Sequence, residues 1–160
     1  MFGDPCRECG FAWDVSTADA TAIVAGVHAR LSRMLAGDAG TERHRDLDWS
    51  VTAYVCHVGD NLRIWAERLA GVALGGSPAV TGCDEAVLGE VRGYETISLP
   101  GALWSLDRAA RDWLDAVAMA PADLTMDHSG FGRLALLDVV RLTAHDTHHH
   151  IWDIERTLPR

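Results

Sequence analysis

The chain has 160 residues, of which 48% are hydrophobic, and it carries a formal net charge of −9. This length and this apolar content suit one folded domain and argue against a disordered chain. The acidic balance, together with the lack of an arginine-rich run, argues against binding to nucleic acid.

The sequence shows no charged segment followed by an apolar stretch of the kind that begins a secretory signal. It also lacks an apolar run of about 18 residues, the length that a membrane span needs. We therefore expect a cytoplasmic protein that makes no contact with a membrane. Its four cysteines should stay reduced there unless a metal binds them.

Residues 1–15 precede the first expected helix and contain Cys6 and Cys9 in the string CRECGF. Such a pair is half of many zinc sites, but a structural zinc needs four ligands and the chain has no second Cys-x-x-Cys pair. A second metal site is therefore one hypothesis. The two thiols could instead form a redox pair, or the segment could pack on the domain through Phe11 and Trp13. The side chains that could complete a metal site are Cys83 and either His28 or His44.

Four long segments have the apolar periodicity and the end signals of helices. They are expected over residues 16–36, 48 or 50 to 70, 100–120 and 134–158. The connection over residues 71–99 is long for a compact domain, and a short helix is expected in it near Asp84 to Gly89. Four helices with a long crossover between the second and the third predict an all-α four-helix bundle.

Histidines on the second and fourth helices are the most informative feature of the sequence. Residues four apart on a helix lie about 40° apart around its axis, so His145 and His149 point the same way. His57 lies on a polar face of the second helix, one turn before Asn61. Two imidazoles and a third from a neighbouring helix can bind a transition metal and leave coordination positions open for chemistry.

Spacing alone does not select the rings that turn inward. A chain with eight histidines contains pairs four residues apart by chance, and His148 and His150 crowd the same turn. On a helical wheel, the face of His145 also carries polar groups whose burial without partners would cost on the order of several kcal/mol. A bound metal or polar ligand would reduce that cost. The polar and aromatic residues on this face are Asp138, Arg141, His149, Trp152 and Arg156.

Two stretches of the chain resemble the DinB-like superfamily. Residues 132–149, GRLALLDVVRLTAHDTHH, resemble its last helix with the pattern G-r-…-l-…-H-x-x-x-H-H. Residues 48–57, DWSVTAYVCH, resemble its second helix. The resemblance covers most of the chain and implies a single domain, residues 1–160, folded as an up-down-down-up bundle. It also implies a divalent transition metal, zinc before nickel or iron, bound by residues matching His57, His145 and His149.

Thiol chemistry is the leading function that the resemblance implies. Several relatives are transferases or isomerases that use mycothiol, bacillithiol or glutathione, and a metal-bound thiolate would be the nucleophile. Asn61 and Arg141 are the candidate catalytic residues, and Arg68 and Trp152 are candidates for binding the thiol or a small substrate. Each arginine could instead form an ordinary salt bridge. The acidic residues available for that are Asp138, Asp60 and Glu67.

Two other functions stay open at this point. The metal could activate water in a hydrolase, or the protein could bind a metal or a small ligand without turnover. Relatives often dimerise, so we expect a homodimer with a small-molecule substrate as its partner.

Overall fold

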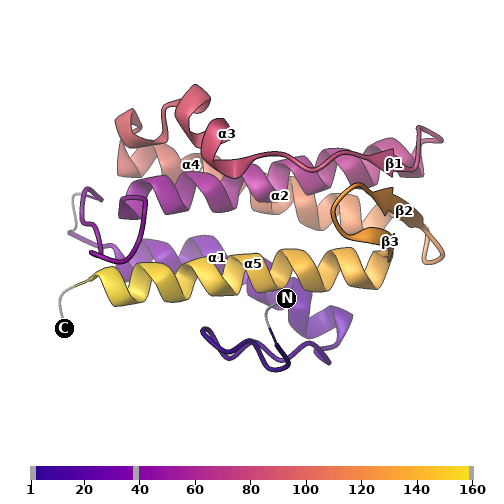
Figure 1. Ribbon diagram of the computed structural model, residues 1–160, viewed down its shortest axis with the longest axis horizontal. Coiled ribbons are helices and arrows are strands. Elements are labelled where there is room, and N and C mark those ends of the chain that lie inside the picture. The colour runs from indigo at the N-terminus through magenta and orange to yellow at the C-terminus, as the bar shows by residue number, and fades with distance from the viewer. Residues whose placement is uncertain (1–2, 38–39, 159–160) are drawn as a thin grey trace.

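The computed structural model describes residues 3–37 and 40–158 (Figure 1). Residues 1–2 and 159–160, the ends of the expected domain, lie outside the described residues. The long helices are α1 (Thr17–Met34), α2 (Val51–Ala73), α4 (Leu99–Met119) and α5 (Leu136–Thr157). The shorter elements are β1 (Ala79–Val80), α3 (Glu85–Arg92), the 3-10 helix η1 (Tyr94–Thr96), β2 (Thr125–His128) and β3 (Gly132–Ala135). The four-helix bundle expected from the sequence is confirmed, but the chain is mostly helical rather than all-α, because three short strands are present.

Polar caps explain where the helices begin. Ser16, Ser50 and Ser98 each accept a hydrogen bond from the backbone N–H three residues further on, which satisfies a donor that the first turn leaves free. Asp84 does the same for α3, the short helix expected in the crossover. At the other end of α2, Gly71 does not stop the helix as expected, because Leu74 N–H still donates to Ala70.

The four long helices form two parallel pairs that run in opposite directions. Ser50 N–H, at the start of α2, donates to Glu95, just before α4, so these two helices begin at the same end. Arg141, near the start of α5, donates to the carbonyl of Val15, just before α1. Since α5 follows β3, at the end where α2 and α4 finish, the second pair runs the other way (Figure 1). The chain between α2 and α4 must therefore travel back along the bundle.

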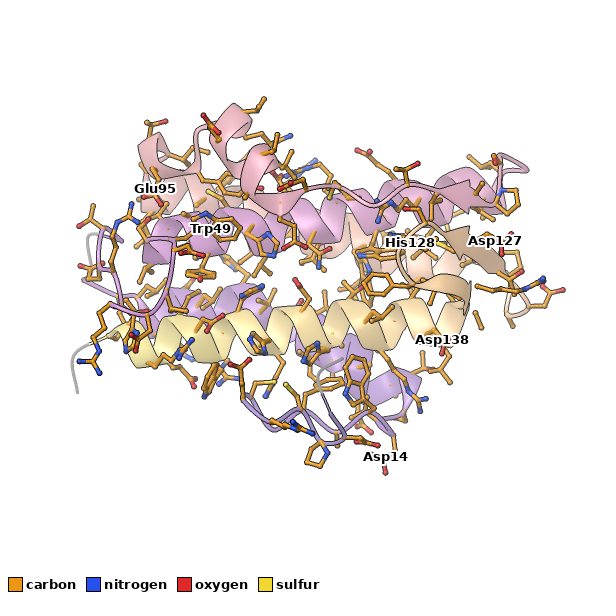
Figure 2. All side chains as sticks on the ribbon, in the orientation of Figure 1. Asp14, Trp49, Glu95, Asp127, His128 and Asp138 are labelled. Atoms are coloured by element: carbon orange, nitrogen blue, oxygen red, sulfur yellow. The ribbon has the colours of Figure 1, made fainter. Side chains whose placement is uncertain are left out.

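A small three-stranded sheet, which the sequence did not lead us to expect, covers the end of the bundle where α2 and α4 finish and α5 begins. β1 pairs in parallel with β2, and β2 pairs antiparallel with β3. The segment before α5, which lies between the last two expected helices, is thus a hairpin. Met126 and His128 are buried while Asp127, between them, is exposed, and Figure 2 shows His128 over the bundle with Asp127 further out. The sheet ties the start of the crossover to the entry of α5.

The apolar core lies between the four helices. Its largest fully buried side chains include Trp113, Leu31, Leu62, Leu106 and Ile151. Gly59 on α2 lets that helix approach α4 closely, because a Cβ there would lie only 3.5 Å from Leu106 Cα. Among the described residues, no helix is long and apolar enough to cross a membrane.

Truncation of Leu106 tests the packing of α4 against α2. Leu106→Ala should lower the free energy of unfolding by about 2–5 kcal/mol, because it removes buried methyl groups and leaves a cavity. Leu74→Ala is the matched control, since Leu74 is 88% exposed, and it should change that energy by less than about 0.5 kcal/mol. Urea denaturation measures both. Equal effects of the two substitutions would contradict the packing described here.

Candidate metal centre

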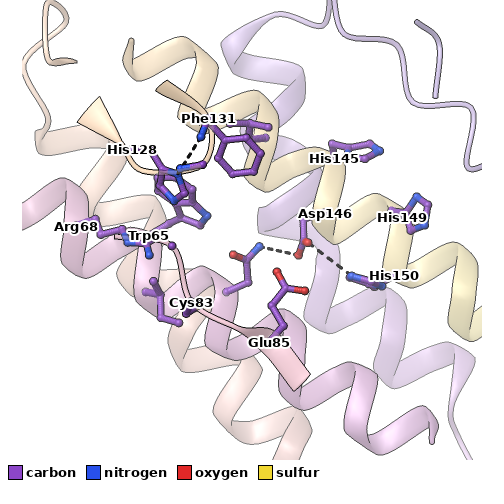
Figure 3. A pocket seen from close by; sticks show the side chains of 15 residues that line it. Trp65, Arg68, Cys83, Glu85, His128, Phe131, His145, Asp146, His149 and His150 are labelled. Carbon is purple, nitrogen blue, oxygen red and sulfur yellow. Dashed lines mark hydrogen bonds and ion pairs between the residues drawn. The ribbon is translucent and has the colours of Figure 1, made fainter. Parts of the chain in front are cut away.

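A cavity of about 490 Å³ opens between α2, α5 and the crossover (Figure 3). This volume lies in the range of pockets that bind small molecules. Ile64, Trp65, Phe131 and Leu142 supply its apolar lining. In Figure 3, His128, Phe131 and Trp65 lie at one end, and Glu85, Asp146 and His150 lie toward the other.

Three ligand-type side chains meet at the second end, and we call His57, Asp146 and His150 the inner cluster. One ligand atom from each lies within 4.8 Å of the other two. Asp146 Oδ1 lies 3.7 Å from His57 Nε2 and 3.6 Å from His150 Nε2. His57 Nε2 is buried and makes no hydrogen bond to any described residue. Imidazole nitrogens and a carboxylate oxygen directed at one point fit a divalent transition metal.

Two hydrogen bonds hold the inner cluster in place. Asn61 Nδ2 donates to Asp146 Oδ2 at 2.6 Å, which leaves Oδ1 for the imidazoles. His150 Nδ1 lies 2.9 Å from Asp153 Oδ2, so Nδ1–H donates there and Nε2 faces Asp146. Asp153 is buried and also accepts a hydrogen bond from Arg156. Bonds of this kind fix the tautomer and orientation of metal-binding side chains.

The carboxylates hold a proton on His150 in the metal-free protein. Burial opposes the imidazolium, but Asp146 and Asp153 outweigh burial and raise the pKa of His150 to about 10. Burial likewise opposes the Asp146 carboxylate, yet His150 and His57 hold the pKa of Asp146 far below its usual range. Because a metal binds neutral imidazole, metal uptake must displace this proton.

Two further side chains border the cavity at opposite ends. Glu85, the first residue of α3, places Oε2 3.8 Å from His57 Nε2 and is 55% exposed. His128 is buried, and its Nδ1 accepts hydrogen bonds from the N–H groups of Gly130 and Phe131. Burial, and then Arg68, lower the pKa of His128, so its ring is neutral and Nε2 carries the proton. The cavity thus has a carboxylate at one end and an N–H donor at the other.

A second set of ligand-type side chains lies on another side of α5. We call Cys6, Cys9, His145 and His149 the outer cluster, and one ligand atom from each lies within 4.8 Å of the others. Figure 3 shows His145 and His149 on a different side of α5 from Asp146 and His150. Burial, with a smaller effect of His149, lowers the pKa of His145 to about 4, and burial also lowers the pKa of His149. Both rings are therefore neutral near pH 7 and can bind a metal.

The structure does not bring His57, His145 and His149 together as the resemblance implied. Successive helical residues differ by about 100° around the axis, so α5 carries two different pairs spaced four apart. The pair Asp146 and His150 lies beside His57, while His145 and His149 lie beside Cys6 and Cys9. The signal in the sequence for the pair beside His57 is the Asp-x-x-x-His spacing of Asp146 and His150. A search for histidine ligands alone does not detect this pair.

The remaining candidate residues divide between the cavity and other parts of the fold. Asn61 and Arg68 line the cavity, and Arg68 lies over the Trp65 ring, 4.7 Å from its centroid. Arg141 lies outside the lining and donates to the Val15 carbonyl at 3.0 Å, which removes it from the reacting region. Trp152 also lies outside the lining, packed beneath Arg156.

The side chains proposed to complete the Cys6 and Cys9 set lie elsewhere. Cys83 is exposed and borders the cavity. His28 faces Asp107, and His44 faces Asp46. In the described part of the chain, the partners of the two cysteines are instead the histidines that sequence analysis had assigned to the first metal.

The chain belongs to the DinB superfamily, whose family model matches residues 25–154, and this confirms the resemblance seen in the sequence. Among solved structures, the chain is similar to YfiT from Bacillus subtilis, described as a probable metal-dependent hydrolase with an unusual four-helix bundle topology. The two share 18% sequence identity over 90% of this chain and 88% of that one, with a TM-score of 0.74. At this identity the likeness shows a shared fold. Comparison with curated proteins gave no significant match.

The raised pKa of His150 predicts a pH dependence of stability in the metal-free protein. The pKa of the side chain is 6.5 without these neighbours and about 10 in the fold. The bound proton therefore stabilises the fold fully below about pH 6.5, and this contribution is lost as the pH rises toward about 10. Urea denaturation of chelator-treated protein should show stability falling over this interval. His150→Gln should flatten the fall, and an unchanged slope in that variant would assign the pH dependence to another group.

Proposed function

We propose that this protein is a metal-dependent enzyme whose inner cluster binds one divalent transition metal at the end of the cavity. The observation that carries the proposal is the convergence of two imidazole nitrogens and a carboxylate oxygen, one of them a buried nitrogen without a hydrogen bond among the described residues. Zinc fits this donor set, as do nickel and iron. Three protein ligands leave positions open, as catalytic metal sites do.

We propose hydrolysis of a small substrate as the reaction. When bound, such a metal lowers the pKa of a coordinated water and so supplies a nucleophile near neutral pH. Glu85, 3.8 Å from His57 and partly exposed, would accept the proton that the water gives up when it becomes the nucleophile. YfiT, which shares the fold, is described as a probable metal-dependent hydrolase, and this supports the choice.

The rest of the cavity supplies substrate binding. Arg68 donates to the Thr81 carbonyl and keeps other N–H donors for a carboxylate or phosphate group on the substrate. His128 offers Nε2–H at the same end. Trp65 and Phe131 flank this ring, with centroids 5.6 and 4.8 Å from it, and provide an apolar surface for the body of the substrate. A small anionic ester or amide fits this combination.

Removal of the inner carboxylate tests the metal dependence. Asp146→Ala should lose the metal of the inner cluster and, with it, hydrolysis of anionic ester and amide probes by at least about 10³-fold, since the activated nucleophile is lost. Asp112→Ala, an exposed change on α4, is the control and should keep both. Elemental analysis and a spectrophotometric assay give the two readouts. Full activity of Asp146→Ala without metal would overturn the proposal.

Substitution of Glu85 tests the acid–base role separately from metal binding. Glu85→Gln should lower kcat by about 10²–10⁴-fold, the usual contribution of a general base, while KM and metal content stay close to those of the wild type. Glu90→Gln, also exposed on α3, is the matched control. If Glu85→Gln loses the metal instead, Glu85 is a ligand rather than a base.

Thiol-dependent transfer or isomerisation is the second candidate function. Membership of the DinB superfamily suggests it, because the sequence resemblance includes relatives that use mycothiol and similar thiols. The cavity of about 490 Å³ also suits an extended thiol, because the N–H donors of Arg68 and His128 lie at the end away from the inner cluster. There the coordinated thiolate would replace water as the nucleophile.

Cobalt spectroscopy separates the two candidates. In cobalt-loaded protein that lacks Cys6 and Cys9, a thiol that coordinates the metal should add a thiolate-to-cobalt absorption band. Thiol transfer predicts this band with mycothiol, bacillithiol or glutathione, and its loss in His57→Ala. If none of the three thiols changes the spectrum, the thiol mechanism fails and hydrolysis is retained.

A further inference from the structure

We propose that the outer cluster is a structural zinc site that fixes the N-terminal segment, residues 3–16, on α5. The four side chains follow the spacing Cys-x2-Cys and His-x3-His, which is that of Cys2His2 zinc sites. In the described part of the chain, these two free cysteines face the two histidines. This site shares no residue with the inner cluster, although His145 and His149 also border the cavity, and it contributes to the fold.

The distances suit tetrahedral zinc. Bond lengths of about 2.3 Å to sulfur and 2.0–2.1 Å to nitrogen place tetrahedral ligand atoms about 3.3–3.8 Å apart. Cys6 Sγ lies 3.9 Å from His149 Nδ1, and one ligand atom from each of the four residues lies within 4.8 Å of the others. A contraction of about 1.5 Å or less at each edge is enough to reach the tetrahedral value.

Two nearby carboxylates favour one nitrogen of His149 as the ligand. Its Nδ1 faces Cys6, while its Nε2 lies 3.5 Å from Glu8 Oε2 and 3.8 Å from Asp153 Oδ2. A histidine that donates its distal N–H toward a carboxylate and binds zinc through the other nitrogen is a common second-layer arrangement. The carboxylates therefore favour the tautomer that leaves Nδ1 free to bind the metal.

The backbone around Cys6 forms a tight turn that aims both thiols at α5. Cys6 N–H donates to the Phe11 carbonyl, and Gly10 N–H donates to the Cys6 carbonyl. The φ of 74° at Gly10 requires a glycine.

Burial and ligand count favour a structural role. Cys6 and His145 are each only 3% exposed, and the rings of Phe11 and Trp13 cover His145 with centroids 5.3 and 4.7 Å away. Four protein ligands close a zinc site, whereas a catalytic zinc keeps one position for water or substrate. The apolar packing that sequence analysis offered as an alternative is thus present together with the ligand set.

The test counts zinc in Asp146→Ala protein, which lacks one inner ligand but retains all four outer ones. Purified under reducing conditions, loaded with zinc and dialysed, it should hold about one zinc per chain, against about two in the wild type. Addition of Cys6→Ser and Cys9→Ser should reduce this to nearly zero. Cys83→Ser in the same background is the control and should leave about one. Because the inner site is disabled in every Asp146→Ala protein, the zinc counts of these variants do not depend on the proposed function.

Cobalt loading of the folded Asp146→Ala protein provides a second readout that needs no cysteine substitution. Two thiolate ligands in a tetrahedral site predict a thiolate-to-cobalt band and intense visible absorption. Absence of both, or no zinc in reduced Asp146→Ala, would overturn the proposal. Full zinc retention after Cys6→Ser and Cys9→Ser would overturn the proposal as well. If Cys6 and Cys9 instead join in a disulfide and bind no zinc after reduction, the segment is a redox pair.

Discussion

The rotation of α5 about its own axis is the constraint on which both clusters depend. Adjacent residues of a helix point about 100° apart, so His145 and Asp146 must face different surroundings, as must His149 and His150. Asp146 and His150 face His57 inside the bundle, whereas His145 and His149 face the N-terminal segment with its two cysteines. A small rotation of α5 would misalign both sets together, and the helix must be held from two sides.

Asp153 connects the two sets. Its Oδ2 lies 2.9 Å from His150 Nδ1 and 3.8 Å from His149 Nε2, and Arg156 donates to its other oxygen. Burial disfavours this carboxylate, yet hydrogen bonds from His150 and Arg156 lower the pKa of Asp153. One buried anion thereby orients an imidazole of each cluster. Contacts of this kind among the α5 side chains offset part of the cost of burying so many polar groups on one helix.

Much of the fold follows from local signals in the sequence. The serine caps and the apolar stripes predict α1, α2, α4 and α5 to within a few residues, and Asp84 predicts the start of α3. The sheet could not be predicted, because β1 has 2 residues and β2 and β3 have 4 each, too few to show a period of two. Its pairing depends on the crossover meeting the hairpin, which is a tertiary event.

The site was predicted less completely than the fold. Cys6, Cys9, His57, His145 and His149 were all identified as ligand-type residues. Their grouping was not, because it depends on the rotation of α5, and a sequence containing four histidines between residues 145 and 150 is consistent with several rotations. Spacing restricts the pairs that can share a metal, and only the packing of the helix decides which neighbour each pair meets.

The crossover has a consequence for how this fold can change its chemistry. Glu85, Cys83 and the carbonyl that binds Arg68 all lie on it, whereas His57, Asp146 and His150 lie on helices of the bundle. The residues from Gly75 to Asp84 are almost all exposed, apart from Val80, which packs against the core and pairs with β2. Insertions or substitutions there can reshape the mouth of the cavity while the metal-binding helices keep their packing. In the proposed enzyme, substrate range and protein stability would therefore depend on separable parts of the chain and could diverge independently.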